Sequence, residues 1–382
     1  MKKVGNIILN FLQTIVILGL ILLIGALIYF FFYKGYNLNQ IEEATGVSLD
    51  FIKNNTINTS EISLKQETEE INITGIEKTN SNESTLQQNI TNTSQKYYYN
   101  QLDTAIAKAI YEVLEQNKDN LKTGTYEINL PSNITNVLYN ENGEELLGEA
   151  FQEAWDAFIY DYTDMFFIDT SKICLLTTTT TFGSKKTYTV TMGKGENENY
   201  FEKGFSNYED VKGALQQLEN VRNQMKNQLV ADSEYEKIKK VHDWLVDNLE
   251  YDVSLERTNT HNIYGALIER CVVCEGYAKA FKYIMDSLDI PCILVKGVGT
   301  NSSGQTEKHM WNYVYIENNW YAIDVTWDDP VIEGKGWLTQ KMKYAYFLKG
   351  SNEFNKSHNE DGQISVNGKT FSYPILNIEN YE

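Results

Sequence analysis

The feature of this sequence that most constrains its fold is an apolar run close to the N-terminus. Residues 15–33 contain no polar side chain other than tyrosine hydroxyls, and residues 7–12 in front of them are also largely apolar. The run of 19 residues is close to the roughly 20 that cross a bilayer as a helix, and longer than the core of about 7–15 residues in a cleaved signal peptide. The sequence therefore predicts a transmembrane signal anchor over residues 7–33.

The charged residues around this anchor predict its orientation. Lys2 and Lys3 precede the apolar run and Lys34 follows it, and positive residues favour the cytoplasmic side of a membrane. We therefore expect residues 1–6 in the cytoplasm and the rest of the chain outside the cell membrane.

The formal net charge is −19. Because binding to phosphates needs clustered Lys and Arg, this charge argues against a nucleic-acid partner.

Beyond the anchor, changes in composition divide the chain further. Residues 34–96 are rich in Asn, Thr, Ser, Glu and Gln and have little to bury, which predicts a flexible low-complexity linker. Residues 97–230 combine amphipathic helical spacing with β-rich pieces, and predict a small α+β accessory domain without a recognisable catalytic constellation. Residues 231–358 predict a second α+β domain, and residues 359–382 a C-terminal tail that packs on its core.

The second domain is predicted to combine helices with an antiparallel sheet. Ser233 is followed three residues later by Glu236, and this capping box predicts the start of a helix. Another helix begins at or next to Cys274, because apolar residues recur at helical spacing after it. Strands are predicted over residues 292–298, 309–316 and 320–326, with Asn318-Asn319 as the turn of a hairpin.

Three residues of this domain have the chemistry of a thiol enzyme. A thiol at a helix N-terminus lies at the positive end of the helix dipole, which favours the thiolate of Cys274. His309 can take the thiol proton, and Asp324 can hold that histidine in one tautomer. In a hairpin that turns at Asn318-Asn319, however, Tyr313 lies opposite Asp324, and His309 is about four residues out of register. A strong twist, a bulge or a shifted turn must close this gap.

The segments around these residues resemble those of bacterial transglutaminase-like proteins. Residues 273–281 (VCEGYAKAF) look like the nucleophile segment of that family, residues 309–312 (HMWN) like its histidine segment, and residues 321–330 (YAIDVTWDDP) like its aspartate segment. Residues 241–245 (VHDWL) and 248–252 (NLEYD) look like its leading helix. The spacings agree as well, with 35 positions from the cysteine to the histidine and 15 from the histidine to the aspartate.

The resemblance covers about residues 235–358 and implies a papain-like α+β core with Cys274, His309 and Asp324 as a catalytic triad. It implies acyl transfer from an amide or carboxamide through a Cys274 thioester, to an amine or to water, with no metal and no organic cofactor. The anchor suggests a protein or peptide substrate at the cell envelope. Two alternatives stay open: a surface cysteine protease or amidase that only hydrolyses, and a non-catalytic envelope binding module.

Further residues are candidates for the substrate cleft. Gly276 leaves room for a substrate backbone beside the thiol. The resemblance implies an aromatic residue that lines the cleft near the cysteine, and Trp311 is the candidate. An oxyanion would be held by the Cys274 amide together with one further donor, either Trp244 or Tyr251.

The remaining cysteines and histidines have other interpretations. Cys271 and Cys274 have the spacing of a redox or zinc pair, but the sequence lacks the second ligand pair of a zinc site. A reversible disulfide between them that switches the enzyme off is a hypothesis. Four residues are predicted to have structural roles: Cys174 and Cys292 as small buried residues, His242 as a satisfied helix histidine, and His358 as structural or exposed.

Overall fold

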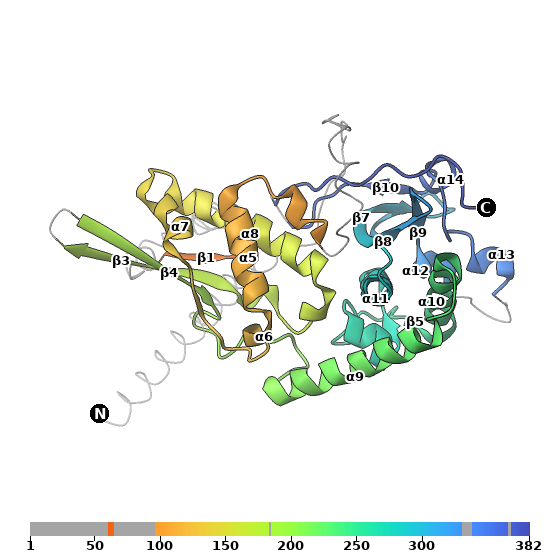
Figure 1. The fold of residues 1–382 in the computed structure, drawn as a ribbon, viewed down its shortest axis with the longest axis horizontal. Coiled ribbons are helices and arrows are strands. Elements are labelled where there is room, and N and C mark those ends of the chain that lie inside the picture. Colours follow the sequence, from red (N-terminus) through yellow and green to blue (C-terminus); the bar gives the residue numbers. More distant parts are fainter. Residues whose placement is uncertain (1–59, 65–95, 183–184, 331–337, 366–367) are drawn as a thin grey trace, which may run out of the picture. The chain divides into compact units, whose positions relative to one another are not determined.

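The computed structural model describes residues 60–64, 96–182, 185–330, 338–365 and 368–382, which all belong to one compact unit (Figure 1). The predicted cytoplasmic segment and transmembrane anchor lie outside the described residues, as does most of the predicted linker. In the part of the chain that is described, no helix is both long and apolar enough to cross a membrane. The anchor therefore stays a prediction from the sequence.

The N-terminal part of the described chain combines helices with an antiparallel sheet of strand order β1-β3-β4-β2. Its elements, in chain order, are β1 (Ser60–Ser63), η4 (Tyr99–Gln101), α5 (Ala105–Gln116), α6 (Lys118–Leu121), β2 (Ile128–Asn129), α7 (Ser132–Thr135), η5 (Asn136–Tyr139), α8 (Gly143–Asp161), η6 (Thr163–Met165), η7 (Thr170–Lys172), β3 (Cys174–Phe182) and β4 (Lys185–Gly193).

Strand β1 corrects the prediction that residues 34–96 form only a linker. It runs antiparallel to β3 at the edge of the sheet, with Ser63 opposite Cys174. Ile62 packs against the hydrophobic core and Leu64 is buried. Two apolar residues in a polar stretch are too few to show a periodic pattern. Pairing with β3 nevertheless gives their backbone groups hydrogen-bond partners and lets both side chains join the core.

The C-terminal part contains the candidate site. Ser233 accepts a hydrogen bond from the Glu236 amide at 3.2 Å, and α10 begins there as predicted. The elements of this part are α9 (Tyr208–Gln228), α10 (Glu234–Asn248), β5 (Glu250–Tyr251), η8 (Gly265–Glu269), β6 (Cys271–Val272), α11 (Cys274–Ser287), β7 (Cys292–Thr300), β8 (Thr306–Ile316), β9 (Asn319–Ile323), α12 (Val325–Asp328), α13 (Gln340–Lys343), α14 (Ser351–Phe354) and β10 (His358–Glu360).

An antiparallel sheet of strand order β10-β7-β8-β9 supports this part, and α11 packs against its two central strands (Figure 1). The face of α11 that meets the sheet is apolar, with Phe281, Ile284 and Met285 all buried. Asn312 on β8 ties the two layers together, because its side-chain amide donates to the Ala278 carbonyl of α11 at 3.0 Å. The helix that begins at Cys274 is therefore held against the strand that carries His309.

The β8–β9 hairpin turns one residue earlier than predicted. Ile316 pairs with Asn319, so the turn residues are Glu317 and Asn318. Both have positive φ, at 48° and 64° respectively, which is the conformation of a two-residue type I′ turn. Asparagine tolerates this left-handed conformation better than most residues, but the Asn318-Asn319 sequence is compatible with either position of the turn.

The shifted turn brings the histidine and the aspartate closer together. Asn312 pairs with Ile323, and continuing this register by one position places Asp324 opposite Trp311. His309 is then two residues from the position opposite Asp324, rather than the predicted four. Because side chains alternate between the two faces of a sheet, residues two apart share a face and are diagonal neighbours. The predicted gap is closed mainly by the choice of turn.

The predicted boundary near residue 230 separates two parts that contact each other. Helix α9 packs against α11 and η8. The Tyr98 hydroxyl donates to the Leu294 carbonyl on β7, and the Ser365 hydroxyl donates to Asp156 on α8 at 2.5 Å. The C-terminal tail runs beside the same core, where Leu376 forms a bridge with Trp320. Whether these parts are separate domains stays a prediction.

Candidate active site

Cys274 is held at the start of α11 by the backbone on its N-terminal side. The short strand β6 pairs in parallel with β5, and the Val273 amide donates to the Thr260 carbonyl at 3.0 Å. Val273 is extended, so the helix begins at Cys274 itself. The thiol is partly exposed and lies at the N-terminus of α11, at the positive end of the helix dipole.

His309 and Asp324 form a buried hydrogen-bonded pair, with Nε2 of the histidine 2.7 Å from Oδ2 of the aspartate. Burial acts to lower the pKa of His309, but the charge and hydrogen bond of Asp324, together with a side-chain hydrogen bond to Cys274, raise that pKa well above its usual value. The pairing also holds the pKa of Asp324 below its ordinary value in spite of burial. Because Nε2 is occupied, Nδ1 is the ring nitrogen left for the thiol proton.

The Asp324 carboxylate is fixed by four hydrogen bonds. Asp324 is the N-cap of α12, and its Oδ1 accepts from the amides of Thr326 at 3.1 Å and Trp327 at 3.2 Å. Its Oδ2 accepts from His309 and also lies 3.0 Å from Nε2 of His358. The helix cap therefore sets the direction of the carboxylate that faces His309.

His242 in turn anchors helix α12. Nε2 of His242 lies 3.0 Å from Oδ2 of Asp328, and Nδ1 lies 3.2 Å from Oδ1 of Asp243. The Tyr346 amide donates to the other oxygen of Asp328 at 2.8 Å. His242 is thus the satisfied helix histidine that the sequence predicts, and it holds the turn of chain that carries Asp324.

His358 is a member of the site that the sequence patterns did not single out. Of the two predicted alternatives, structural or exposed, the structure excludes exposure: His358 is buried, and its Nε2 points at Asp324. Its ring stacks on Phe354, with 4.0 Å between the ring centroids. An isolated histidine in a polar segment gives no local signal of burial. Only the pairing of β10 with β7, which sets His358 opposite Gly299, brings it to the carboxylate.

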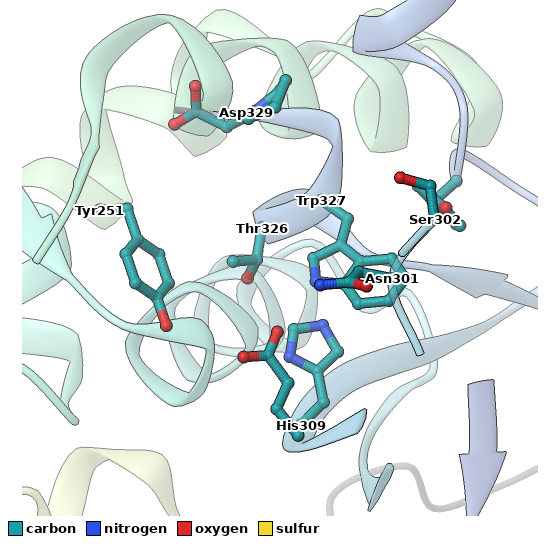
Figure 2. Close-up of a pocket in the computed structure, with 10 residues that line it drawn as sticks. Tyr251, Asn301, Ser302, His309, Thr326, Trp327 and Asp329 are labelled. Carbon is teal, nitrogen blue, oxygen red and sulfur yellow. The ribbon is translucent and has the colours of Figure 1, made fainter. Parts of the chain in front are cut away.

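A pocket of about 400 Å³ opens beside His309 (Figure 2). In Figure 2 the side chain of Tyr251 lies on one side of Thr326 and that of Trp327 on the other, where Trp327 approaches His309 with 5.1 Å between the ring centroids. The pocket is lined by Tyr251, Asn301, Ser302, Glu307, His309, Thr326, Trp327, Asp329, Pro330 and Tyr346.

The lining of this pocket is acidic. Glu307 and Asp329 contribute carboxyl groups, and neither Lys nor Arg is among the residues that line it. Burial raises the pKa of Asp329 to about 6, although the Tyr277 hydroxyl donates to its carboxyl group at 2.7 Å. Near neutral pH these carboxyl groups give the pocket negative charge, and His309 is the basic residue in its lining. The two carboxyl groups favour a ligand with a positive charge.

Of the four predicted cleft residues, only Tyr251 lines the pocket. Burial raises its pKa, and the nearby Cys274 raises it further, so its hydroxyl is a protonated donor close to the sulfur. Trp244 lies elsewhere, in a second hollow that Met225 also lines, with the Arg270 guanidinium 4.1 Å from its ring centroid. Of the two predicted oxyanion donors, the geometry therefore favours Tyr251.

Trp311 and Gly276 are corrected by the structure. Trp311 is only 1% exposed, because its ring fills the space over Gly297, where an added Cβ would lie 2.8 Å from it. Trp327 is the tryptophan that lines the pocket instead. Gly276 is buried, and an added Cβ would lie 2.5 Å from Cβ of Val272. Its lack of a side chain therefore lets α11 pack closely on β6, rather than making room for a substrate.

One group of side chains within the described residues could hold a metal ion, namely His309, Asp324 and His358, whose ligating atoms all lie within 4.8 Å of one another. Both imidazoles direct Nε2 at the same carboxylate oxygen, at 2.7 Å and 3.0 Å. These are ordinary hydrogen-bond distances. The arrangement is therefore fully accounted for as a hydrogen-bonded cluster, and the expectation that no cofactor is needed stays a prediction.

All four cysteines lie in the described residues, and none of them forms a disulfide in the structure. Cys174 and Cys292 are buried, as predicted. Cys271 is also buried, and burial raises the pKa of its thiol. Cys271 is thus less disposed than an exposed cysteine to form thiolate. The hypothesis of a reversible disulfide with Cys274 stays a prediction.

The comparison that bears most directly on this site is with a protein family. The sequence profile of the transglutaminase-like superfamily matches residues 223–325. This chain contains a transglutaminase-like domain. The match begins within α9 and includes Cys274, His309 and Asp324, but it ends before His358.

Similar proteins share this domain rather than the whole chain. The kyphoscoliosis peptidase of Mus musculus is 27% identical over 137 residues, which cover 31% of this chain and 20% of the peptidase. The Homo sapiens peptidase is 25% identical over 127 residues. The chain thus matches about a fifth of the length of these curated relatives.

Among solved structures, a TGase resembles 45% of this chain with 48% of its own length, at 15% identity and a TM-score of 0.28. The periplasmic domain of TgpA from Pseudomonas aeruginosa resembles 37% of this chain with 55% of its own length, at 14% identity and a TM-score of 0.24. These structural likenesses are partial, and the proposal below rests on the site instead.

Proposed function

We propose that the transglutaminase-like domain is a thiol acyltransferase that uses Cys274 as nucleophile, His309 as base and Asp324 as the residue that orients the base. The observation that carries this proposal is the arrangement around His309. Its Nε2 is bonded to Asp324 at 2.7 Å, and its side chain also interacts with Cys274. A nucleophile near a base, and a group that orients the base, are what covalent acyl transfer needs.

The reaction follows from the proton positions. Nδ1 of His309 takes the proton of the Cys274 thiol, and the sulfur attacks the carbonyl carbon of an amide or carboxamide. The C–N bond then breaks while the imidazolium returns the proton to the leaving amine, which leaves a thioester. An amine or water attacks the thioester carbonyl carbon while His309 removes its proton. The C–S bond then breaks, the new amide or acid leaves, and the imidazolium returns the proton to the Cys274 sulfur. The Cys274 amide and the Tyr251 hydroxyl are the proposed donors to the oxyanion.

The charge of the pocket favours an amine as the acceptor. Glu307 and Asp329 line the space beside His309, and the lining contains no Lys or Arg. A primary ammonium group is therefore attracted to the side of the thioester from which His309 can remove a proton. Hydrolysis alone, as in a cysteine protease or amidase, uses the same catalytic residues and is the second candidate, since water can reach a partly exposed thiol.

The test uses the full chain in detergent with a glutamine-containing peptide and an excess of a lysine-like amine, and mass spectrometry identifies the products. We expect the amine-linked peptide in the parent and none in Cys274→Ala. Deamidated or cleaved peptide without the adduct would assign the domain to hydrolysis. Absence of any product, together with a Cys274 thiol that alkylates no faster than free cysteine, would favour the binding-module alternative.

Location at the cell envelope is part of the proposal. It is supported by the apolar run of residues 7–33, by the polar composition that follows it and by the flanking lysines. A protein or peptide at the membrane surface is the proposed substrate. If the anchor spans the membrane, the full chain should stay with membranes after an alkaline wash and be released by detergent. Release by alkali alone would contradict the anchor while leaving the proposed chemistry intact.

A further inference from the structure

The Asp324 carboxylate has a second imidazole partner that the proposed reaction does not use. Nε2 of His309 and Nε2 of His358 lie 2.7 Å and 3.0 Å from the same oxygen, Oδ2. The other oxygen is occupied by two backbone amides. The two histidines therefore share one acceptor atom, and the hydrogen bond from either of them weakens the acceptor for the other.

Two glycines allow the histidines to meet across a strand. His309 is on β8 and His358 on β10, and β7 lies between them. On β7, Gly297 pairs with His309 and Gly299 with His358. A Cβ added at Gly299 would lie 2.7 Å from the Trp327 ring and 3.4 Å from Cβ of His309. With no side chain on this face of β7, the two imidazole rings approach to 5.6 Å between centroids.

The surroundings of His358 keep it neutral. Aromatic rings enclose it, including Phe354 at 4.0 Å and Trp327 at 4.5 Å between ring centroids. Burial and the nearby His309 lower its pKa below the usual value, although Asp324 acts to raise it. The Ser357 hydroxyl lies 2.9 Å from Nδ1. A neutral imidazole that donates to Asp324 through Nε2 accepts a hydrogen bond from the Ser357 hydroxyl at Nδ1.

We infer that His358 is a positioning residue that shares the Asp324 carboxylate with His309, and so limits how strongly the carboxylate holds the His309 proton. This inference rests on the proposed function, in which His309 must release its proton to the leaving amine as well as take one from the thiol. A carboxylate that interacts with His309 alone stabilises the imidazolium strongly and so opposes this release. A neutral N–H group that donates a hydrogen bond to the same oxygen weakens this stabilisation of the imidazolium without adding a second positive charge.

Several ionisable groups surround this cluster. His309 faces Asp324 and Cys274. His358 faces Asp324 and His309, with the Tyr346 ring at 5.3 Å. The Glu307 carboxyl group also lines the pocket beside His309, and Asp328 and Tyr251 lie near enough to Asp324 to interact with its charge. Of all these groups, Asp324 is the one bonded to both histidines. Loss of the hydrogen bond from His358 should therefore act on the proton affinity of His309 mainly through Asp324.

The test follows alkylation of Cys274 by iodoacetamide against pH in the full chain, with mass spectrometry to assign the labelled site. The parent is compared with His358→Phe, which keeps a ring but no donor, and with His358→Gln, which keeps a donor near the position of Nε2. Phe354→Leu is the matched control, since it removes the ring that stacks on His358 but leaves the hydrogen bonds in place.

In His358→Phe we expect the pH range in which Cys274 is a thiolate and His309 an imidazolium to widen by about 0.5–1 unit. The reason is that Oδ2 of Asp324 then accepts a hydrogen bond from one imidazole, that of His309. His358→Gln should return the profile toward that of the parent, and Phe354→Leu should lower the melting temperature without moving the profile. Ser357→Ala provides a milder variant if His358→Phe does not fold. Ser357→Ala should also widen this pH range, but by less than His358→Phe.

A folded His358→Phe or Ser357→Ala variant with the parent's profile, or a Phe354→Leu profile that moves as far as that of His358→Phe, would overturn the inference and make His358 a packing residue. An NMR titration of the His309 ring separates this result from failure of the proposed function. If Cys274 reacts like a free thiol in the parent, the acyltransferase proposal fails. A higher His309 pKa in His358→Phe would still support the shared carboxylate, and an unchanged one would reject it.

Discussion

At the scale of single residues, Asp324 is the residue on which the proposed role of His309 depends most. Its charge stabilises the protonated form of His309, and its hydrogen bond leaves Nδ1 free for the thiol. We predict that Asp324→Asn lowers kcat by about 10³–10⁴-fold, since an amide at this position supports the wrong tautomer. Steady-state kinetics of amine incorporation would measure the loss. A loss of less than tenfold in a variant with the parent's melting temperature would show that His309 does not depend on this carboxylate.

Tyr251 is the residue through which the oxyanion prediction can be tested. Its hydroxyl is protonated and close to Cys274, whereas Trp244 lies in a different hollow. We predict that Tyr251→Phe lowers kcat by about 10²–10³-fold, as loss of one oxyanion donor does elsewhere, with little change in KM. Trp244→Phe is the matched control and should leave kcat close to that of the parent. Equal effects of the two substitutions would remove Tyr251 from the proposed oxyanion site.

At the scale of elements, the β8–β9 turn decides whether His309 and Asp324 can meet. Glu317 and Asn318 both have positive φ. We predict that Asn318→Val lowers the free energy of unfolding by about 1–2 kcal/mol, because a β-branched residue is strained in the left-handed region. Asn318→Gly should be neutral or stabilising. Urea unfolding would measure both changes, and a tolerated valine would show that residue 318 is not held in the left-handed conformation.

At the scale of the whole molecule, a buried carboxyl group joins α8 to the C-terminal segment. Asp156 accepts hydrogen bonds from Ser365 at 2.5 Å and from Gln152 at 2.9 Å, and burial raises its pKa to about 7 from an ordinary value of 3.8. The native state thus keeps a proton that the unfolded chain loses near pH 4. Unfolding releases this proton between those two values, so the free energy of unfolding falls as pH rises from about 4 to about 7.

We predict that Asp156→Asn reduces this pH dependence, because the neutral amide carries no proton that unfolding can release. The difference in slope between the parent and the variant should be at most about 1.4 kcal/mol per pH unit, and it should be confined to the range between about pH 4 and pH 7. Chemical denaturation at several pH values would measure it. Parallel curves for the two proteins would show that Asp156 is already ionised in the native state across that range.

Local patterns in the sequence determined the parts of this protein that depend on neighbours along the chain. The Ser233–Glu236 cap and the apolar stripes predict helices, because capping and helical periodicity act over a few residues. The start of a helix at Cys274 is local in the same sense. The order and spacing of Cys274, His309 and Asp324, read together with their flanking segments, were enough to predict the domain that the family profile also matches.

Tertiary structure decided which residues meet across the sheet. The turn at Glu317 and Asn318 differs from the predicted one by a single residue, a choice that the Asn-Asn pair leaves open, yet it changes the offset of His309 from Asp324 from four residues to two. Small shifts of register have this effect because every residue of a strand moves with them. The exchange of Trp311 for Trp327 in the pocket follows from packing over Gly297 in the same way.

His358 shows most clearly what the sequence leaves undetermined. It reaches Asp324 only because β10 pairs with β7, because β7 lies beside β8, and because residues 297 and 299 of β7 are glycines. Each of these facts joins segments that are distant along the chain, and no local periodicity encodes such a pairing. The sequence therefore determined which chemical groups this domain carries, and the strand order and register decided that two histidines share one carboxylate.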